Sequence, residues 1–145
     1  MLVVTDTNVL VRALLGGPGS SAILRLWQAG RIRLVICRQT LEELAEVLAR
    51  PKFRRYFSED NARRLLTLLR QRGEWVEITS NMAACRDAKD DVFLNLAISA
   101  QARYLVSHDE DLVGDATLKA KMEADYQVRI VREAELAAAV AKQGQ

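Results

Sequence analysis

Five short apolar runs, separated by segments of helical periodicity, constrain the fold of this chain more than any other feature. The runs are residues 2–5, 33–37, 75–78, 104–107 and 128–131. They have no helical period, which is typical of strands buried on both faces. Strands that alternate with helices predict a parallel sheet covered on both sides. We therefore expect an α/β fold in three layers, α/β/α, with a central parallel sheet of about five strands.

The intervening segments are predicted to be helices from their apolar spacing and their capping residues. A short helix, Asn8–Leu15, is followed by the helix-ending run Gly16-Gly17-Pro18-Gly19, and Ser20 or Ser21 caps the next helix, which stops at Gly30. Further helices are predicted over residues 39–49, 58–73, 91–102 and 133–142. Residues 91–102 are apolar nearly all round, which indicates a central, buried helix.

The totals fit one soluble domain spanning residues 1–145. A chain of 145 residues, half of them apolar, is long enough to bury a real core. The two cysteines, Cys37 and Cys85, have neither disulfide nor zinc spacing, so a core role is favoured for them. No signal segment or membrane-length apolar run is present, and we expect a cytoplasmic protein.

Charge is unevenly distributed along the chain, although the net charge is only +2. Residues 50–72 carry eight basic side chains against two acids. The acids concentrate later, between residues 86 and 115 (Asp87, Asp90, Asp91, Asp109, Glu110, Asp111 and Asp115). One basic and one acidic region on the same domain is an asymmetry that a nucleic-acid enzyme can use.

Acidic side chains recur where the predicted strands end. Ligand sites of open α/β sheets lie beyond the carboxyl ends of the strands. The acids expected at this edge are Asp6 after the first strand, Glu42 and Glu43 after the second, Asp87, Asp90 and Asp91 before the buried helix, and Asp109 and Asp111 after the fourth strand.

Each of these acids also has a structural interpretation. Asp6-Thr7-Asn8 is compatible with a capped strand-to-helix turn, and Asp90 or Asp91 with a helix N-terminus. Glu42 and Glu43 both lie off the apolar stripe of their helix, so periodicity does not separate them. The sequence 109–111 is compatible with an exposed turn. The repetition at one sheet edge is the stronger argument for a site.

Carboxylates gathered in one crevice repel one another unless a cation lies between them. Oxygen ligands without a cysteine or histidine cluster favour Mg²⁺ or Mn²⁺ over zinc. Such an ion activates water and stabilises displacement at phosphorus without a histidine base. The single histidine, His108, is therefore expected to be a bystander.

Four blocks of this sequence, in this order, resemble the PIN-domain family: Val4–Leu10, Leu41–Phe53, Asp87–Ala97 and Ala102–Leu112. The likeness extends to about Val131. The second block, with its Arg50-Pro51-Lys52 ending, is similar to the branch described as VapC-like toxin components of toxin–antitoxin pairs.

The resemblance implies an endoribonuclease whose acidic pocket binds Mg²⁺ or Mn²⁺. By position, the catalytic and metal-binding acids of the family fall on Asp6, Glu43, Asp90 and Asp109. The resemblance, and not the helical period, selects Glu43 over Glu42 and Asp90 over Asp91. Supporting roles fall on Thr7 and Asn8, which brace the first acid, on the Ser107 hydroxyl, and on Asp87 and Asp111 as outer or second-metal ligands. His108 departs from the glycine that is frequent there and is expected to narrow the pocket rim.

The basic segment is the expected RNA contact, through Arg50, Lys52, Arg54 and Arg55, with aromatic neighbours that can stack on unpaired bases. The same aromatics are equally compatible with packing inward or with a subunit contact. The resemblance also implies a homodimer or higher homo-oligomer and a small antitoxin partner.

The same acids are compatible with four alternatives to a toxin nuclease. A receiver-type phosphorylation switch needs an acceptor aspartate after the third strand, where Thr79 and Ser80 follow instead. A phosphatase with an aspartyl nucleophile needs a second aspartate at position 8, which is Asn8. A PIN nuclease of RNA processing, or a silent PIN scaffold acting as a binding module, stays open.

Overall fold

A computed structural model describes residues 1–16, 21–85 and 87–143 of the chain. Its centre is a five-stranded sheet in the order β3-β2-β1-β4-β5, and each neighbouring pair of strands is parallel. The strands are β1 (Leu2–Thr5), β2 (Arg33–Ile36), β3 (Glu74–Trp75), β4 (Tyr104–Val106) and β5 (Arg129–Val131). The predicted parallel sheet of five strands is confirmed.

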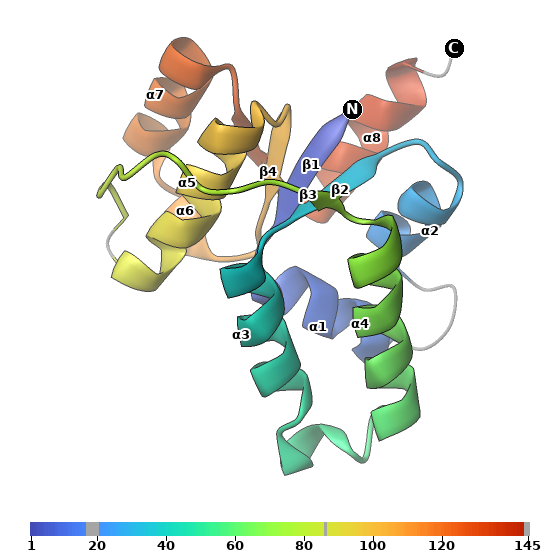
Figure 1. Cartoon of the computed structure of the whole chain (residues 1–145). Coiled ribbons are helices and arrows are strands. Elements are labelled where there is room, and N and C mark those ends of the chain that lie inside the picture. Colours follow the sequence, from blue (N-terminus) through green and yellow to red (C-terminus); the bar gives the residue numbers. More distant parts are fainter. Residues whose placement is uncertain (17–20, 86, 144–145) are drawn as a thin grey trace.

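Helices cover both faces of this sheet (Figure 1). They are α1 (Thr7–Leu15), α2 (Ala22–Gln28), α3 (Arg38–Leu48), α4 (Glu59–Arg72), α5 (Asp91–Ala100), α6 (Glu110–Val113), α7 (Ala116–Tyr126) and α8 (Glu133–Gln143), with 3-10 turns η1 (Pro51–Phe53) and η2 (Ala88–Asp90). Ser21 caps α2 through its hydroxyl. The other predicted signals there, Gly17 to Ser20, lie outside the described residues.

The core is divided into two layers by the alternation of side chains along each strand. Val3 and Leu34 pack into one apolar cluster with α1, α2, α3, α4 and α8. Their neighbours Val4 and Val35 pack into the other cluster, with α5, α6 and α7. Because both faces of such a strand are covered by helices, successive side chains are all apolar, which explains the continuous apolar runs. The three-layer α/β/α architecture is confirmed.

The predicted third strand, residues 75–78, is wrong in its extent, because β3 contains only Glu74 and Trp75. After Trp75 the chain leaves the sheet edge and forms hydrogen bonds with Ser99 and Asn95 of α5. The Ser99 hydroxyl accepts hydrogen bonds from the amides of Thr79 and Ser80, at 2.9 and 3.3 Å. Tertiary hydrogen bonds that a local apolar pattern cannot reveal therefore shorten this strand.

Two helices, α6 and α7, are absent from the sequence prediction. Only Leu118 and Met122 of α7 are buried, and alanines and polar residues make up most of the rest, so its amphipathic signal is weak. Asp109 and Asp115 cap α6 and α7, each accepting a hydrogen bond from a backbone amide of its helix. Asp109 and Asp115 are thus placed by helix starts, whereas the sequence of residues 109–111 is also compatible with an exposed turn.

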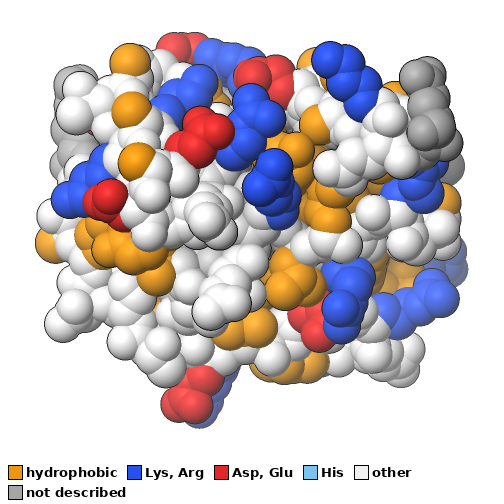
Figure 2. Space-filling view, turned by 90° about the horizontal axis from the view of Figure 1, so that it is seen from above, with side chains coloured by type: hydrophobic (Ala, Val, Ile, Leu, Met, Phe, Trp, Pro, Cys, Tyr) orange, Lys and Arg blue, Asp and Glu red, His pale blue; other side chains and the backbone are white. Residues whose placement is uncertain are grey.

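The helices α3 and α4 form an antiparallel hairpin that extends beyond the carboxyl ends of the strands, with the basic segment 50–57 at its tip (Figure 1). The opposite end of the molecule, where β1 begins, shows basic and acidic side chains mixed with small apolar patches (Figure 2). The end that carries the hairpin is therefore the one where the sheet edge, the acids and the basic segment meet.

Candidate active site

Asp6 lies at the carboxyl end of β1, at the centre of the sheet, and caps α1. It is 6% exposed. One carboxylate oxygen, Oδ1, accepts a hydrogen bond from the Val9 amide at 3.0 Å, and Oδ2 accepts one from the Ser107 hydroxyl at 2.5 Å. Burial raises the pKa of Asp6 above its usual range, and the two hydrogen bonds offset this only in part. Asp6 is thus a buried acid held in one orientation.

Ser107 links the first strand to the fourth. It is fully buried directly after β4, where its hydroxyl donates to Asp6 and accepts a hydrogen bond from the Asp109 amide at 3.0 Å. The Asp109 carboxylate then accepts a hydrogen bond from the Asp111 amide at 2.9 Å, which caps α6. One serine therefore sets the positions of two acids whose strands are neighbours.

Asp90 completes an aspartate cluster with Asp6 and Asp109. Burial raises its pKa to about 6, and repulsion from Asp109, Asp87 and Asp6 adds to the effect. Its oxygen Oδ2 is buried and has no hydrogen-bond partner within the described residues. Asp87 lies at the rim, where its side chain caps η2 through the Lys89 amide. Asp90 is half-buried, its buried oxygen has no hydrogen-bond partner among the described residues, and neighbouring acids disfavour its charge, so a bound cation would stabilise it.

Asp91, unlike Asp90, is hydrogen-bonded to the backbone of the preceding loop. Its Oδ1 accepts hydrogen bonds from the amides of Ala84 and Cys85, at 3.1 and 2.8 Å. Burial alone would raise the pKa of Asp91, but these hydrogen bonds outweigh it and the pKa is lowered. Asp91 therefore anchors the preceding loop, which gives a physical reason for the choice of Asp90 that helix periodicity could not supply.

Glu43 lies in the second turn of α3 and is half-buried. Its charge is not among the main contributions to the raised pKa of Asp6 or of Asp90. Its neighbour Glu42 is exposed and pairs with Arg38 at 2.9 Å on the helix surface. Of the two glutamates, Glu42 is therefore paired on the helix surface, whereas Glu43 is the half-buried one.

The donor set suits a hard divalent cation. Within the described ranges, no three acidic, histidine or cysteine side chains are yet close enough together to hold one ion. Carboxylate oxygens dominate the edge, and the buried Oδ2 of Asp90 lacks a hydrogen-bond partner among the described residues. Burial, and then the charges of neighbouring acids, raises the pKa of Asp90, so a bound cation would favour its charged form.

Thr7 and Asn8 are predicted to brace Asp6, and neither side chain is hydrogen-bonded to its carboxylate among the described residues. The Thr7 hydroxyl is buried without a hydrogen-bond partner in the described part of the chain, and Asn8 is exposed. The bracing comes instead from Ser107 and from the Val9 amide. The reason is the start of α1 at Thr7, since the helical turn directs the next two side chains away from the carboxylate that caps it.

His108 is turned toward the start of α8. Its Nε2 lies 3.6 Å from the Glu133 carboxylate, and both side chains are 21% exposed. Glu133 also accepts a hydrogen bond from the Ile23 amide at 3.1 Å, so it joins α8, α2 and the active-site edge. Glu133 carries no motif that marks it in the sequence, because only the fold brings these distant segments together.

The basic segment is divided by its packing. Arg54 is partly buried, where its guanidinium donates to the Leu48 carbonyl and lies 5.2 Å over the Phe57 ring. This corrects the prediction of Arg54 as an RNA contact, because it caps the end of α3. The other three basic residues are exposed, so their contact with RNA stays a prediction: Arg50, Lys52 and Arg55.

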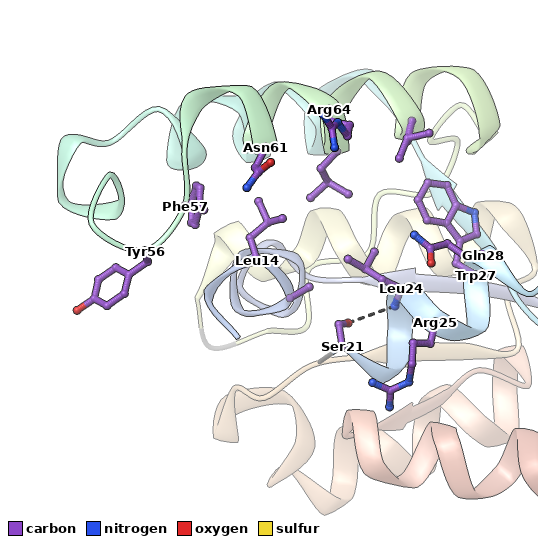
Figure 3. A pocket seen from close by; sticks show the side chains of 13 residues that line it. Leu14, Ser21, Leu24, Arg25, Trp27, Gln28, Tyr56, Phe57, Asn61 and Arg64 are labelled. Carbon is purple, nitrogen blue, oxygen red and sulfur yellow. Dashed lines mark hydrogen bonds between the residues drawn. The ribbon is translucent and has the colours of Figure 1, made fainter. Parts of the chain in front are cut away.

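A separate apolar groove of about 400 Å³ lies between α4 on one side and α1 and α2 on the other (Figure 3). Leu14 and Leu24 point into it, and Arg64 of α4 stands over it. Tyr56 at its end is 58% exposed. This groove is distinct from the acidic edge and contains none of the predicted catalytic acids.

A family model described as the PIN domain matches residues 2–111, which is more than half of the chain. The chain belongs to the PIN-domain family. A protein of Methanocaldococcus jannaschii, described only as uncharacterized, is 31% identical to this PIN domain over 115 residues, covering 77% of this chain and 72% of the relative.

The matched segment contains Asp6, Glu43, Asp90 and Asp109, whereas α7, β5 and α8 lie beyond it. PIN domains are generally nucleases, so the family indicates a hydrolase that acts on nucleic acid. No helix among the described residues of this PIN domain combines the length and the apolar character needed to cross a bilayer.

Proposed function

We propose that this PIN domain is a metal-dependent endoribonuclease that hydrolyses phosphodiester bonds of RNA. The observation that carries the proposal is the linkage of Asp6 and Asp109 by one buried serine, together with a buried carboxylate oxygen of Asp90 that has no hydrogen-bond partner among the described residues. Buried polar atoms are normally hydrogen-bonded, whereas one buried oxygen of Asp90 has no such partner among the described residues, and burial together with the charges of Asp109, Asp87 and Asp6 raises the pKa of Asp90. Repelling buried acids are typical of a functional site.

Asp6, Glu43, Asp90 and Asp109 are proposed to hold Mg²⁺ or Mn²⁺, with Asp87 and Asp111 as outer or second-metal ligands. When bound, such an ion supplies Lewis acidity to water and to the phosphate oxygens. The protein's own contribution is orientation. Ser107 fixes Asp6, and the Asp109 amide is fixed by the same hydroxyl, so two ligands keep their positions without a cation.

The substrate is proposed to reach the acids from the side of the α3–α4 hairpin. Arg50, Lys52 and Arg55 are exposed near its tip, and cations there would attract a phosphate backbone. An acidic pocket alone repels a polyanion, so such basic side chains are needed to offset the repulsion. This division of charge supports RNA binding across the end of the sheet.

The biological role is proposed to be that of a VapC-like toxin, which acts as a homo-oligomer and is held inactive by a small antitoxin. The groove between α1, α2 and α4 supports a protein partner, because its apolar floor and its basic rim at Arg64 suit an amphipathic segment with acidic residues. A role in RNA processing, or as a binding module, is the alternative, and co-expression with the product of an adjacent small gene distinguishes them.

One assay tests the activity. Purified protein is incubated with labelled RNA in the presence of Mn²⁺ or Mg²⁺, and cleavage is expected only with the metal. EDTA and the Asp6→Asn substitution should each abolish it. Equal cleavage by wild-type and Asp6→Asn protein would contradict the proposed site, and no cleavage of any RNA with either metal would favour the silent binding module.

A further inference from the structure

A hollow of about 360 Å³ opens directly beside Asp109 and runs along α1 to the 3-10 turn η1. Its walls include Arg12, Phe53 and His108, with Val11 and Leu15 as the apolar part. The hollow joins the acidic edge to the basic segment, two regions that are about 40 residues or more apart in sequence. Its size lies at the lower end of the roughly 300–1,000 Å³ typical of ligand sites.

Arg12 is the cation of this hollow. It is exposed on α1, four residues after Asn8, so the two side chains lie on the same face of the helix. Within the described residues its guanidinium makes no hydrogen bond or ion pair. A guanidinium that lines the same hollow as Asp109 can bind a phosphate that the aspartates would otherwise repel.

Phe53 supplies an ordered aromatic wall. Its ring stacks on the buried Phe57 with 5.6 Å between centroids and 17° between planes, which fixes the ring before any ligand binds. The Lys52 ammonium lies 5.2 Å from its centroid, so a second cation accompanies the ring. An ordered ring with a lysine ammonium beside it, in the same hollow as Arg12, offers a nucleotide both an aromatic surface and cationic contacts.

We propose that this hollow holds the nucleotide next to the scissile phosphate, with Arg12 on its backbone phosphate and the Phe53 wall against its base. The proposal rests on the proposed ribonuclease function and deepens it. It assigns Arg12 and Phe53 as substrate-positioning residues, which neither the family's acids nor the basic segment includes. A base reaches Phe53 only when it is unpaired, since paired bases are stacked within a helix.

The binding test uses the Asp6→Asn protein without metal, so that the RNA probe stays intact. Fluorescence anisotropy with a short labelled single-stranded RNA of mixed sequence gives the affinity. Arg12→Ala should weaken binding about tenfold and reduce the slope of log affinity against log salt by about 0.7, the value for one lost phosphate contact on a single strand. Phe53→Leu, which keeps an apolar side chain, should weaken binding roughly tenfold through lost stacking.

The kinetic test uses the metal-loaded protein with the same RNA. Arg12→Ala should raise KM about tenfold while kcat changes little, because binding is lost equally in the ground and transition states. Arg12→Lys should restore most of the affinity. The matched control is Arg103→Ala, an exposed arginine just before β4, at the opposite end of the strand from the acids. Arg103→Ala should bind and cleave like wild type.

The outcomes separate this inference from the proposed function. If wild-type protein cleaves RNA and both Arg12→Ala and Phe53→Leu bind and cleave equally well, the inference is overturned and the function stands. If wild-type protein cleaves nothing, the function fails, and the anisotropy data still decide whether the hollow binds RNA. A Phe53→Leu protein that does not fold leaves the decision to the Arg12 variants, since Arg12 is exposed.

Discussion

The hydroxyl of Ser107 donates a hydrogen bond to the carboxylate of Asp6, 101 residues earlier in the sequence, and the same oxygen receives the amide of Asp109. This one side chain fastens the ends of β1 and β4, which are neighbours in the sheet. It is fully buried, so its two bonds are sheltered from water. The positions of two predicted metal ligands therefore depend on a residue that would not itself contact the metal.

Replacement of Ser107 by alanine should weaken metal binding and cleavage without unfolding the protein. Loss of a residue that orients a ligand typically costs about 10–100-fold in metal affinity or activity. Isothermal titration with Mn²⁺ and the RNA cleavage assay measure the two effects. Ser99→Ala is the matched control, because Ser99 accepts two backbone hydrogen bonds on α5 away from the acids. Equal effects of the two substitutions would contradict the orienting role.

Replacement of Asp90 by asparagine should separate stability from activity. Asp90 is repelled by Asp109 and Asp87, so removal of its charge should raise the Tm of the metal-free protein while it abolishes cleavage. Asp91→Ala should instead lower the Tm and retain cleavage, since it removes the carboxylate that accepts hydrogen bonds from the amides of Ala84 and Cys85. That loss should cost about 1–2 kcal/mol of stability and leave residual activity. Thermal unfolding in EDTA, together with the cleavage assay, compares the two neighbours.

Stability and activity should depend on pH in opposite directions around the titration of Asp90. Its pKa is raised from 3.8 to about 6, so the folded state binds a proton more tightly than the unfolded state. The metal-free protein gains stability from this preference below pH 3.8, and the gain is lost as pH rises through about 6. Cleavage should fall as pH drops through the same range, because protons compete with the cation.

Denaturant unfolding in EDTA between pH 5 and 7.5, repeated with Asp90→Asn, measures the first effect. The substitution should flatten the stability profile in this window. A profile that is unchanged by the substitution would show that another group is responsible, and Asp6, whose pKa is also raised, would be tested next.

Replacement of Glu43 by glutamine should reduce cleavage strongly, whereas Glu42→Gln should not. Glu42 pairs with Arg38 on the surface of α3, an exposed pair of the kind that contributes only about 0.3–0.5 kcal/mol. Glu43 has no such pairing and is the glutamate nearer the interior. Cleavage rates of both variants at saturating Mn²⁺, with thermal unfolding as a check on folding, decide between them. Full activity of Glu43→Gln would remove it from the proposed metal ligands.

The sheet and most helices could be predicted because their causes are local. Val3 and Val4 face opposite layers, and that requirement is written in the sequence as an unbroken apolar run. The end of the third strand and the helix α7 could not be predicted in this way. The segment after β3 is held by a hydrogen bond to Ser99, which is distant in the sequence. Helix α7 buries only Leu118 and Met122, so its sequence has no strong apolar periodicity.

The candidate acids could be predicted as a group, but not their individual roles. Family resemblance selected Asp90 over Asp91, and the hydrogen bonds of Asp91 supply the physical reason. The hydrogen bonds that hold Asp6 come from the Val9 amide of α1 and from Ser107, and the second of these joins residues 101 positions apart. Arg54 was predicted to face RNA but donates to the Leu48 carbonyl, since the end of α3 needed a partner for its carbonyls.

The sequence by itself determined that this chain forms a parallel α/β sheet and that carboxylates gather at the end of its strands. Both follow from strand burial and from the common direction of parallel strands, which short patterns express. Only the tertiary structure decided which groups meet there. Ser107 reaches Asp6, and Arg12 and Phe53 border the same hollow beside Asp109, because folding brings distant segments within contact range. Such contacts depend on packing in three dimensions, and no local pattern specifies them.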